Sequence, residues 1–504
     1  MRRQWATYAP PSSPPTHSLP LPSGYPPPRH SQSQSQSQSQ SQVQLQTRRV
    51  RKTLRAFCSP RRLTTTLRRT CYALALILLL YALWIVSKGV PPAYEGVRAY
   101  ERALPQHNLT RALEGGTLYL RVAGQVSGRG FNNVLQETLL LSYLSFRLGR
   151  AYVFEDYTWS RLPTPYVLHA HALRPSRLPL NAFISGPTAG GPISPSPSAS
   201  ESESESESVP APRSVGVAFW ETICPRGERR VVSAEGQPSG GDASEILEWW
   251  VGRLGGVRDR CVEIDSRTRV VFDYLVFGDT GILSIWPGLS ASPMMKNFRW
   301  SALVRSALEA NAGVLQVSLS DRRHDDRNRG AVEKGLVAIH LRRGDFAGHC
   351  EYLARYGARY MGFNRFPSFP DTFDPNPSTS TSTSTSIHGH YLTHCLPTPS
   401  QILSKLRAVR ASSPGLRRVY VLTNGARGWV ARLREAARAD GWEDLRSSLD
   451  LRMGREAGYV GVAVDMAIAE RAEVFVGNGF SSLTSNVAAL RMARGFDPST
   501  TRFL

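Results

Sequence analysis

The first 94 residues contain no aspartate or glutamate, although 13 of the 61 lysines and arginines lie there. The remaining 48 basic residues face all 40 acidic ones, so the formal charge of +21 falls to +8 beyond residue 94. A nucleic-acid-binding domain concentrates basic charge on its folded surface. This distribution argues against nucleic acid as a partner of the folded part.

Cysteine is also scarce, with six in 504 residues. Four of them follow residue 87, and an even number in an oxidising compartment favours disulfides. Nearest-neighbour pairing would join Cys224 to Cys261 and Cys350 to Cys395. The other two pairings stay open at this level.

A zinc site is the alternative for these cysteines. Metal-ligand types occur in two groups, His349-Cys350 and the histidines 388, 390 and 394 before Cys395. A long low-complexity segment separates the two groups, which is unlike a compact zinc module. Disulfides are therefore the favoured interpretation.

Residues 71–86 are uncharged and apolar, between Arg68-Arg69 and Lys88. Extended to 70–87, the run has 18 residues, the short end of what a bilayer of roughly 30 Å needs. We predict one transmembrane helix and a membrane-anchored protein, since the region before it is too long for a cleaved signal peptide.

The orientation follows from the basic amino side of this run. Arginines there favour the cytosol, which gives a single-pass type II protein with most of its chain in the lumen. A short span suits the endoplasmic reticulum or Golgi membrane. The N-glycosylation triplet Asn108-Leu109-Thr110 agrees with a luminal location.

Composition divides the rest of the chain. We predict a disordered basic cytosolic tail, a stem after the membrane helix, and two folded domains that each contain a low-complexity insert. The boundaries are 1–69 for the tail, 88–115 for the stem, 116–299 and 300–504 for the domains, and 192–208 and 378–386 for the inserts.

Strand and helix patterns alternate within both domains. Such alternation predicts parallel βαβ units, and two halves of this kind flanking a nucleotide cleft. The predicted strands are 117–122, 151–154, 336–340, 418–422 and 473–476, and the predicted helices are 134–148, 245–254, 400–411, 427–439, 459–471 and 482–492.

The strand 336–340 runs directly into Arg342, Arg343 and Gly344. Guanidinium groups match phosphate oxygens bidentately, and ligands of open α/β sheets lie where strands end. The pair predicts a diphosphate site, with an ordinary charged surface loop as the alternative.

Two further clusters lie where strands meet helices. Residues 128–133 follow the first strand, but Asn133 replaces the third glycine of the dinucleotide fingerprint, so that motif fails. Near the end of the chain, Asp465 lies on a predicted helix, and Ser481, Ser482 and Leu483 begin the last one. Backbone and hydroxyl donors at a helix start suit phosphate.

Together the three clusters resemble the GDP-fucose protein O-fucosyltransferases, more distantly the α-1,6-fucosyltransferases, in a branch that looks fungal. The resemblance covers roughly residues 117–504 and is strongest in 340–345 and in the last 40 residues. It implies an α/β, GT-B-like fold of two Rossmann-like domains facing a nucleotide-sugar cleft. It also implies inverting transfer of fucose from GDP-fucose to a protein or glycan hydroxyl, with no cofactor and no metal.

The resemblance also assigns roles. Arg342 contacts the diphosphate and assists the departure of GDP, with Asp345 beside it in the catalytic motif and Arg343 as a brace. Substrate contacts are implied for Gly130, Phe131, Asn132, His340, Arg343, Asp465, Ser481, Ser482 and Leu483. The sequence contains no Asp-x-Asp triplet, the usual metal-diphosphate signature of the other large glycosyltransferase architecture.

The acceptor base is the point of departure from this family. Some protein O-fucosyltransferases place a glutamate before Gly-Phe-Asn, where this chain has Arg129. A base must come from elsewhere, or the reaction proceeds without a strong one. Glu155 and Asp156, after the strand 151–154, are the candidates. Competing interpretations are a transferase for another GDP-sugar and a catalytically silent luminal glycan-binding protein.

Overall fold

The computed structural model describes residues 65–124, 130–169, 171–193, 211–240, 242–266, 269–316, 332–376 and 386–504. Most of the predicted tail and of the two predicted inserts, together with Arg129, lie outside these ranges.

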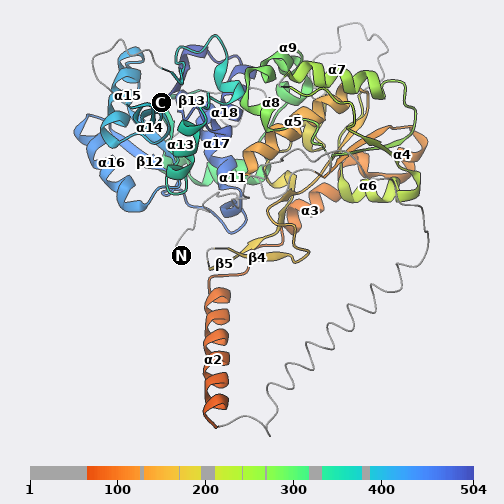
Figure 1. The fold of residues 1–504 in the computed structure, drawn as a ribbon, viewed down its shortest axis with the longest axis horizontal. Coiled ribbons are helices and arrows are strands. Elements are labelled where there is room, and N and C mark those ends of the chain that lie inside the picture. The colour runs from red at the N-terminus through yellow and green to blue at the C-terminus, as the bar shows by residue number, and fades with distance from the viewer. Residues whose placement is uncertain are drawn as a thin grey trace, which may run out of the picture. The chain divides into compact units, whose positions relative to one another are not determined.

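The amino-terminal domain is built on a five-stranded sheet whose paired strands all run parallel. The strand order is β7 (Val215–Gly216), β2 (Ala151–Phe154), β1 (Tyr119–Ala123), β9 (Cys261–Asp265) and β8 (Arg230–Ser233). Its helices (Figure 1) are α3 (Glu95–Arg102), α4 (Leu109–Glu114), α5 (Phe131–Arg147), α6 (Val217–Ile223), α7 (Ala243–Leu254), α8 (Tyr274–Gly278), α9 (Trp286–Ala291) and α10 (Pro293–Lys296).

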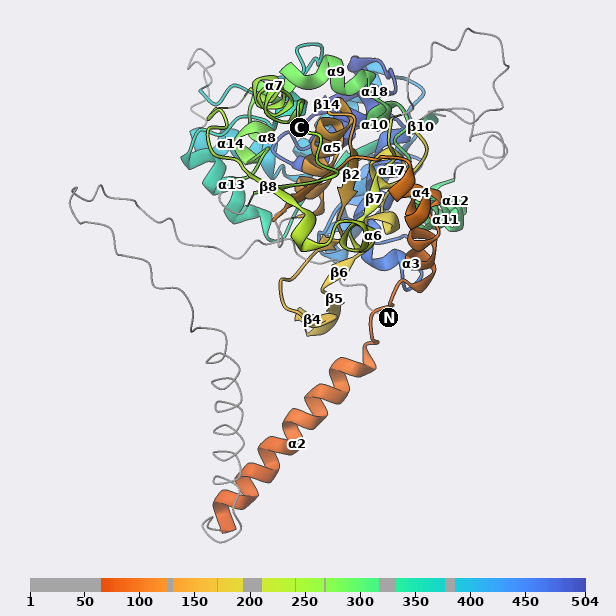
Figure 2. The same cartoon turned by 90° about the vertical axis from the view of Figure 1, so that its right-hand side faces the viewer.

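Helices cover both faces of this sheet (Figure 2). Leu120 and Val122 of β1 pack with α5 on one face, while Tyr119 packs with Trp220 of α6 on the other. A parallel strand buried on both faces needs a nearly continuous apolar run, which explains these sequences. Residues 157–178 contain two further two-stranded sheets. One pairs β3 (Tyr157–Thr158) with β6 (Arg177–Leu178), and the other pairs β4 (Tyr166–His169) with β5 (Ala172–Pro175).

The carboxyl-terminal domain repeats this design with a second five-stranded parallel sheet. The order is β12 (Asp444–Ser447), β11 (Arg418–Leu422), β10 (Glu333–His340), β13 (Ala472–Gly477) and β14 (Thr501–Phe503). Its helices are α11 (Ala302–Ala310), α12 (Ala312–Leu315), α13 (Phe346–Arg355), α14 (Ile387–Cys395), α15 (Pro399–Ser412), α16 (Arg427–Ala439), α17 (Gly461–Arg471) and α18 (Ser482–Ala493).

Side chains alternate between two cores along β10. Val337 and Ile339 pack against α15 and α16, whereas Leu336 and Ala338 face the side that α17 and α18 cover. The strand order confirms the predicted α/β class with two Rossmann-like domains in a GT-B-like architecture.

The predicted stem differs from what the structure contains. Residues 91–167 and 174–504 form one compact unit, and α3 and α4 belong to it. Tyr94 is 2% exposed and its hydroxyl donates to the Glu456 carbonyl oxygen over 2.8 Å. Leu104 and Ala112 are also buried, so apolar packing folds this segment onto the domain.

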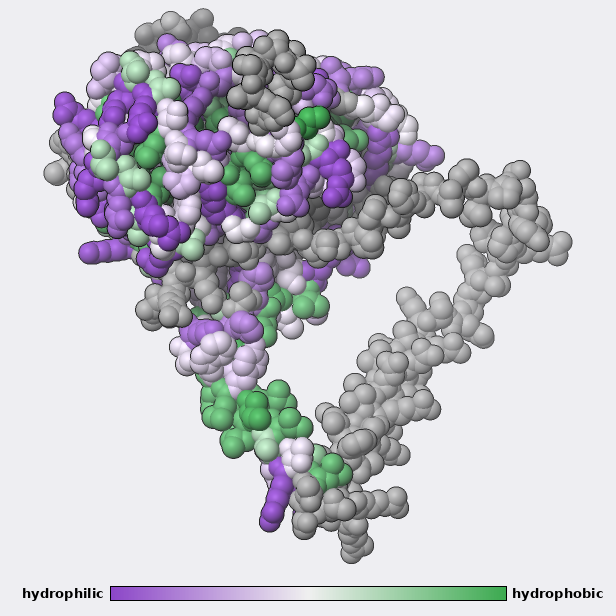
Figure 3. Space-filling view, turned by 60° about the vertical axis from the view of Figure 1, so that its left-hand side comes forward, coloured by the Kyte–Doolittle hydropathy of each residue, from purple (hydrophilic) through white to green (hydrophobic). Residues whose placement is uncertain are grey.

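Residues 65–90 belong to a separate unit that contains helix α2 (Thr65–Ser87). Among the described residues, α2 is the one helix long and apolar enough to cross a membrane. Its outward-facing leucines are largely exposed, as in Leu78 at 66%, and give the green surface in Figure 3. A membrane would cover this apolar surface.

Both nearest-neighbour disulfides are confirmed, Cys224 with Cys261 and Cys350 with Cys395. The zinc alternative is wrong, because the sulfurs of Cys350 and Cys395 are bonded to each other and offer no thiolate to a metal.

Candidate functional site

The carboxyl end of β10 carries the arginine pair on a tight turn. His340 ends the strand, and α13 begins at Phe346. The turn requires a left-handed backbone at Gly344, where φ is +65°, and a residue with a Cβ would be strained there. Arg342 and Arg343 are therefore held between a strand end and a helix start.

Arg342 is held in place by Asp345 and Phe346 at the start of α13. Its Nη2 lies 2.8 Å from Asp345 Oδ2, and its guanidinium carbon is 4.7 Å from the centroid of the Phe346 ring. The side chain is 26% exposed. A charged fork with partial exposure, fixed by a carboxylate and a ring, is arranged to meet an anion from solvent.

Arg343 is held by different groups. Its peptide N–H donates to Asn424 Oδ1 over 2.7 Å, and its guanidinium donates to the Pro397 carbonyl oxygen and lies 4.3 Å from the Trp429 ring centroid. Burial lowers its pKa to about 10. These contacts match a bracing role.

Asn424, which the sequence analysis missed, joins the two halves of this turn. Besides accepting from Arg343, it donates through Nδ2 to Asp345 Oδ1 over 3.0 Å. Because β11 runs parallel beside β10, Asn424 lies just beyond the same sheet edge. Its position after a predicted strand was the signal that could have found it.

His340 connects this turn to the start of α18. Its Nδ1 lies 3.0 Å from Thr484 Oγ1, and the residue is 5% exposed. Burial, and secondly the charge of Arg342, lower its pKa to about 3. The imidazole is therefore neutral at physiological pH and acts through hydrogen bonding.

The loop before α18 is held in place by contacts of Asn478, Gly479 and Ser481. Asn478 accepts from the Phe480 N–H and donates to the Cys395 carbonyl oxygen over 2.8 Å. A Cβ on Gly479 would lie 2.3 Å from the Tyr360 ring, so glycine is required. Ser481 then caps α18 by accepting from the Leu483 N–H. Ser482 and Leu483 are partly exposed at this helix start.

The amino-terminal segment reaches the same helix. Asn486 on α18 donates through Nδ2 to the Asn132 carbonyl oxygen at 2.8 Å and to its side-chain Oδ1 at 3.1 Å. Asn132, His340 and residues 481–483 thus converge on α18, which also lies beside α5 (Figure 1).

Phe131 precedes Asn132 and packs in the core of the amino-terminal domain. Its ring is 1% exposed and stacks on Phe183 at 4.1 Å between centroids. A ring so buried anchors the Gly130–Asn132 turn, and the substrate contact of Phe131 stays a prediction.

Asp465 lies on α17, and the residue is 5% exposed. It accepts from Tyr420 at 2.6 Å and from Ser448 at 2.8 Å. Burial raises its pKa to about 7, against the opposing effect of these two hydrogen bonds. It shares the carboxyl-terminal domain with His340 but is held by a separate set of partners.

The contribution of Asp465 to folding stability is expected to fall as pH rises from about 4 to about 7, because the folded state holds the Asp465 proton that the unfolded state releases. Buried histidines such as His340 contribute the opposite slope over this range. Asp465→Asn should therefore make the free energy of unfolding rise more steeply with pH than in the wild type. Urea unfolding at pH 5 and pH 7.5 measures both slopes, and an unchanged slope in the variant would contradict the assignment.

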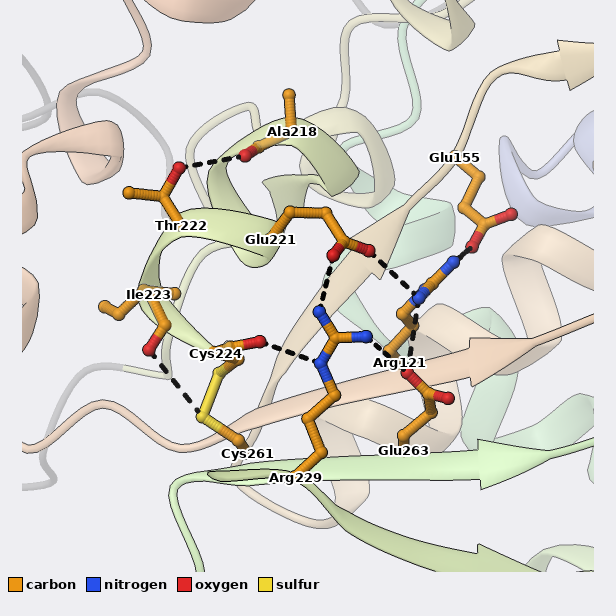
Figure 4. A network of polar contacts seen from close by, with 10 residues as sticks. All are labelled: Arg121, Glu155, Ala218, Glu221, Thr222, Ile223, Cys224, Arg229, Cys261 and Glu263. Carbon is orange, nitrogen blue, oxygen red and sulfur yellow. Dashed lines mark hydrogen bonds and ion pairs between the residues drawn. A yellow bond between two sulfur atoms is a disulfide. The ribbon is translucent and has the colours of Figure 1, made fainter. Parts of the chain in front are cut away.

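The two candidate bases belong to ion pairs of the amino-terminal domain. Arg98 engages both carboxylate oxygens of Asp156, at 2.7 and 2.5 Å. Arg121 contacts Glu155 through Oε1 at 2.8 Å (Figure 4). The same arginine also meets Glu221 and Glu263, each at 3.2 Å.

This network reaches the first disulfide through Arg229. The Arg229 side chain donates to the Cys224 carbonyl oxygen and forms ion pairs with Glu221 and Glu263 (Figure 4). Burial outweighs the arginine and raises the pKa of Glu155.

The model of the GDP-fucose protein O-fucosyltransferase family matches residues 291–494. This part of the chain is O-fucosyltransferase-like. The O-fucosyltransferase-like region contains every predicted site residue of the carboxyl-terminal domain, from His340 to Leu483. No curated protein matches the chain.

Solved structures similar to the chain include POFUT1 in complex with GDP, at 15% identity and a TM-score of 0.46, covering 77% of this chain and 98% of that one. They also include the fucosyltransferase NodZ from Bradyrhizobium, at 12% identity and a TM-score of 0.31, covering 74% and 92%. Both are too distant to assign a ligand or a role to any residue of the O-fucosyltransferase-like region.

Proposed function

We propose that this protein transfers fucose from GDP-fucose to a hydroxyl group of a protein or glycan. The observation that carries the proposal is the family match over residues 291–494, the segment that contains Arg342, His340 and the start of α18. A fixed cation and N–H donors at a helix start stabilise a diphosphate leaving group, and this segment contains both.

The proposed chemistry is a displacement at the anomeric carbon. The acceptor oxygen forms a bond to this carbon while the bond to the β-phosphate oxygen breaks, and its electron pair leaves with GDP. Arg342 and the N–H group of Ser482 meet the growing negative charge, while the Leu483 N–H donates to the Ser481 cap. Attack from the face opposite GDP inverts the β-linked donor to an α-fucoside.

Charge compensation by Arg342 underlies the proposal that no metal or cofactor is needed. A guanidinium in a fixed ion pair with Asp345 already supplies a cation beside the expected diphosphate. His340 contributes a neutral imidazole held by Thr484, which keeps the turn in register with α18.

For the acceptor proton, Glu155 is a better candidate than Asp156. Arg98 engages both oxygens of Asp156, whereas the ion pair to Glu155 uses Oε1. A raised pKa also makes Glu155 a stronger proton acceptor than an ordinary glutamate.

We further propose that α2 anchors the protein as a single-pass type II protein of the endoplasmic reticulum or Golgi. Two disulfides support an oxidising compartment. Asn108 is exposed and caps α4 through Oδ1, which leaves its nitrogen as the atom that glycosylation would use.

Incubating the full chain in detergent with GDP-fucose, GDP-mannose and UDP-sugars should release nucleotide from GDP-fucose preferentially. Nucleotide release is the measurement, with Arg342→Ala as the control for contaminating activity. Release from another GDP-sugar alone would identify a different donor. If no nucleotide sugar binds, the protein is a catalytically silent relative.

A further inference from the structure

Helix α13 carries an exposed stripe of rings that begins at the proposed leaving-group arginine. Asp345, His349, Tyr352 and Tyr356 follow one another at spacings of four, three and four residues, which places them along one side of a helix. Tyr352 is 54% exposed and Tyr356 is 64% exposed. Neighbouring rings that are exposed together form the kind of contiguous surface that marks a binding site.

The rings form a continuous path away from Arg342. Phe346, which lies under the Arg342 guanidinium, is 4.8 Å from the His349 ring centroid. The His349 ring lies 6.3 Å from Tyr352 with a 12° angle between planes, and Tyr352 lies 4.5 Å from Tyr356. At 6.3 Å, parallel rings do not cover each other's faces.

His349 contributes a further ring to this path. It is exposed, as Tyr352 and Tyr356 are. The path is therefore aromatic from Phe346 to Tyr356.

The helix that carries the stripe is fixed on its other side by a disulfide and by packing. On the opposite side of α13, Cys350 is fully buried and bonded to Cys395 of α14, and Leu353 is 8% exposed. The rings thus project from a helix that is covalently joined to its neighbour.

Open space lies beside the rings. A Cβ built on Gly348 meets no atom within 4 Å, and Gly348 precedes Tyr352 by one helical turn. Glu351 and Arg355 are exposed on the same helix and offer an acceptor and a donor at its margin.

We propose that the exposed face of α13, formed by His349, Tyr352 and Tyr356, binds the acceptor, and that the acceptor group it binds is a sugar ring of a glycan. This inference rests on the proposed function and names its acceptor class. Continuity with Arg342 supports it, since the acceptor hydroxyl must reach the sugar carbon next to the diphosphate.

The chemistry of the face selects a sugar over a peptide. One face of a pyranose ring presents C–H groups that pack on an open aromatic ring, while its edge hydroxyls seek charged partners such as Glu351 and Arg355. A peptide is anchored by side chains that enter pockets, whereas these tyrosines stand open. From Asp345 to Tyr356 the stripe is roughly 16 Å long, enough for more than one sugar ring.

The test measures binding of the full chain in detergent to two arrays. One array holds mannose-, galactose- and N-acetylglucosamine-terminated oligosaccharides, and the other holds unglycosylated serine and threonine peptides. The wild-type protein should bind an oligosaccharide series. Tyr352→Ala and Tyr356→Ala should each weaken that binding about tenfold, while Tyr352→Phe should retain it.

Two further variants separate binding from folding. Gly348→Leu adds bulk where there is open space and improves helix propensity, so it should weaken glycan binding in a stably folded protein. Tyr100→Ala removes a ring of similar exposure, 48%, on α3 and should change nothing.

GDP affinity should be the same in all of these variants. Peptide binding that depends on Tyr352 would overturn the sugar assignment. Glycan binding that ignores both tyrosines, or no binding to either array, would overturn the site. A wild-type protein that fails to bind GDP-fucose refutes the proposed function separately, because donor binding is read without any acceptor.

Discussion

Arg342→Ala is expected to lower the turnover of GDP-fucose about a hundredfold or more, with little change in thermal stability. Removing one charge-stabilising donor from a transition state typically costs about 3 kcal/mol or more. Arg342 is held by Asp345 and Phe346 at partial exposure, where the growing charge of the leaving group would lie. Steady-state GDP release and a melting curve measure the two quantities.

Arg343→Ala is the matched control, since it removes the same group from the neighbouring position. Its guanidinium packs on Trp429 and bonds the Pro397 carbonyl oxygen. We expect a lower melting temperature and a smaller loss of turnover. Equal, mild effects on turnover from both variants would show that the pair is structural, and would remove Arg342 from the chemistry.

Replacing Cys350 and Cys395 together by alanine should lower the free energy of unfolding by about 4 kcal/mol, on the chain-entropy estimate for a loop of this length. The two cysteines are 45 residues apart. The loss should reach the site as well, because the Cys395 carbonyl oxygen accepts from Asn478 and the nearby Pro397 carbonyl oxygen accepts from Arg343. Urea unfolding and GDP affinity are the measurements.

The Cys224–Cys261 disulfide provides the comparison. Its cysteines are 37 residues apart, so its removal should cost nearly as much stability. It lies in the amino-terminal domain, where the Cys224 carbonyl oxygen accepts from Arg229, which also pairs with Glu221 (Figure 4). If both double variants lose GDP affinity equally, the site depends on global stability alone, and the specific support from Cys395 is refuted.

Several elements could be read from the sequence because their patterns are local. The predicted strand 418–422 and helix 427–439 coincide with β11 and α16. Apolar runs buried on both faces identify parallel strands, and their carboxyl ends predict where a ligand site forms.

Other features had no local signal. The segment 88–115 was predicted as a stem because it follows the membrane helix, yet Tyr94 meets a carbonyl oxygen 362 residues away. Phe131 belongs to a motif that suggests ligand contact, and only its stack on Phe183 reveals the packing role.

The sequence by itself determined the α/β class and the disulfide candidates and predicted the position of an anion site, because each depends on residue types at short spacing. Residue types alone left Arg342 and Arg343 alike, since neighbours in a turn have no periodicity that assigns direction, and the resemblance to a family implied their separate roles. The tertiary structure gave them different partners, since it brings Asn424 from 81 residues away against Arg343 and pairs Arg342 with Asp345. The same packing left Tyr352 and Tyr356 exposed to solvent, because the core buries Cys350 and Leu353 on the other side of α13.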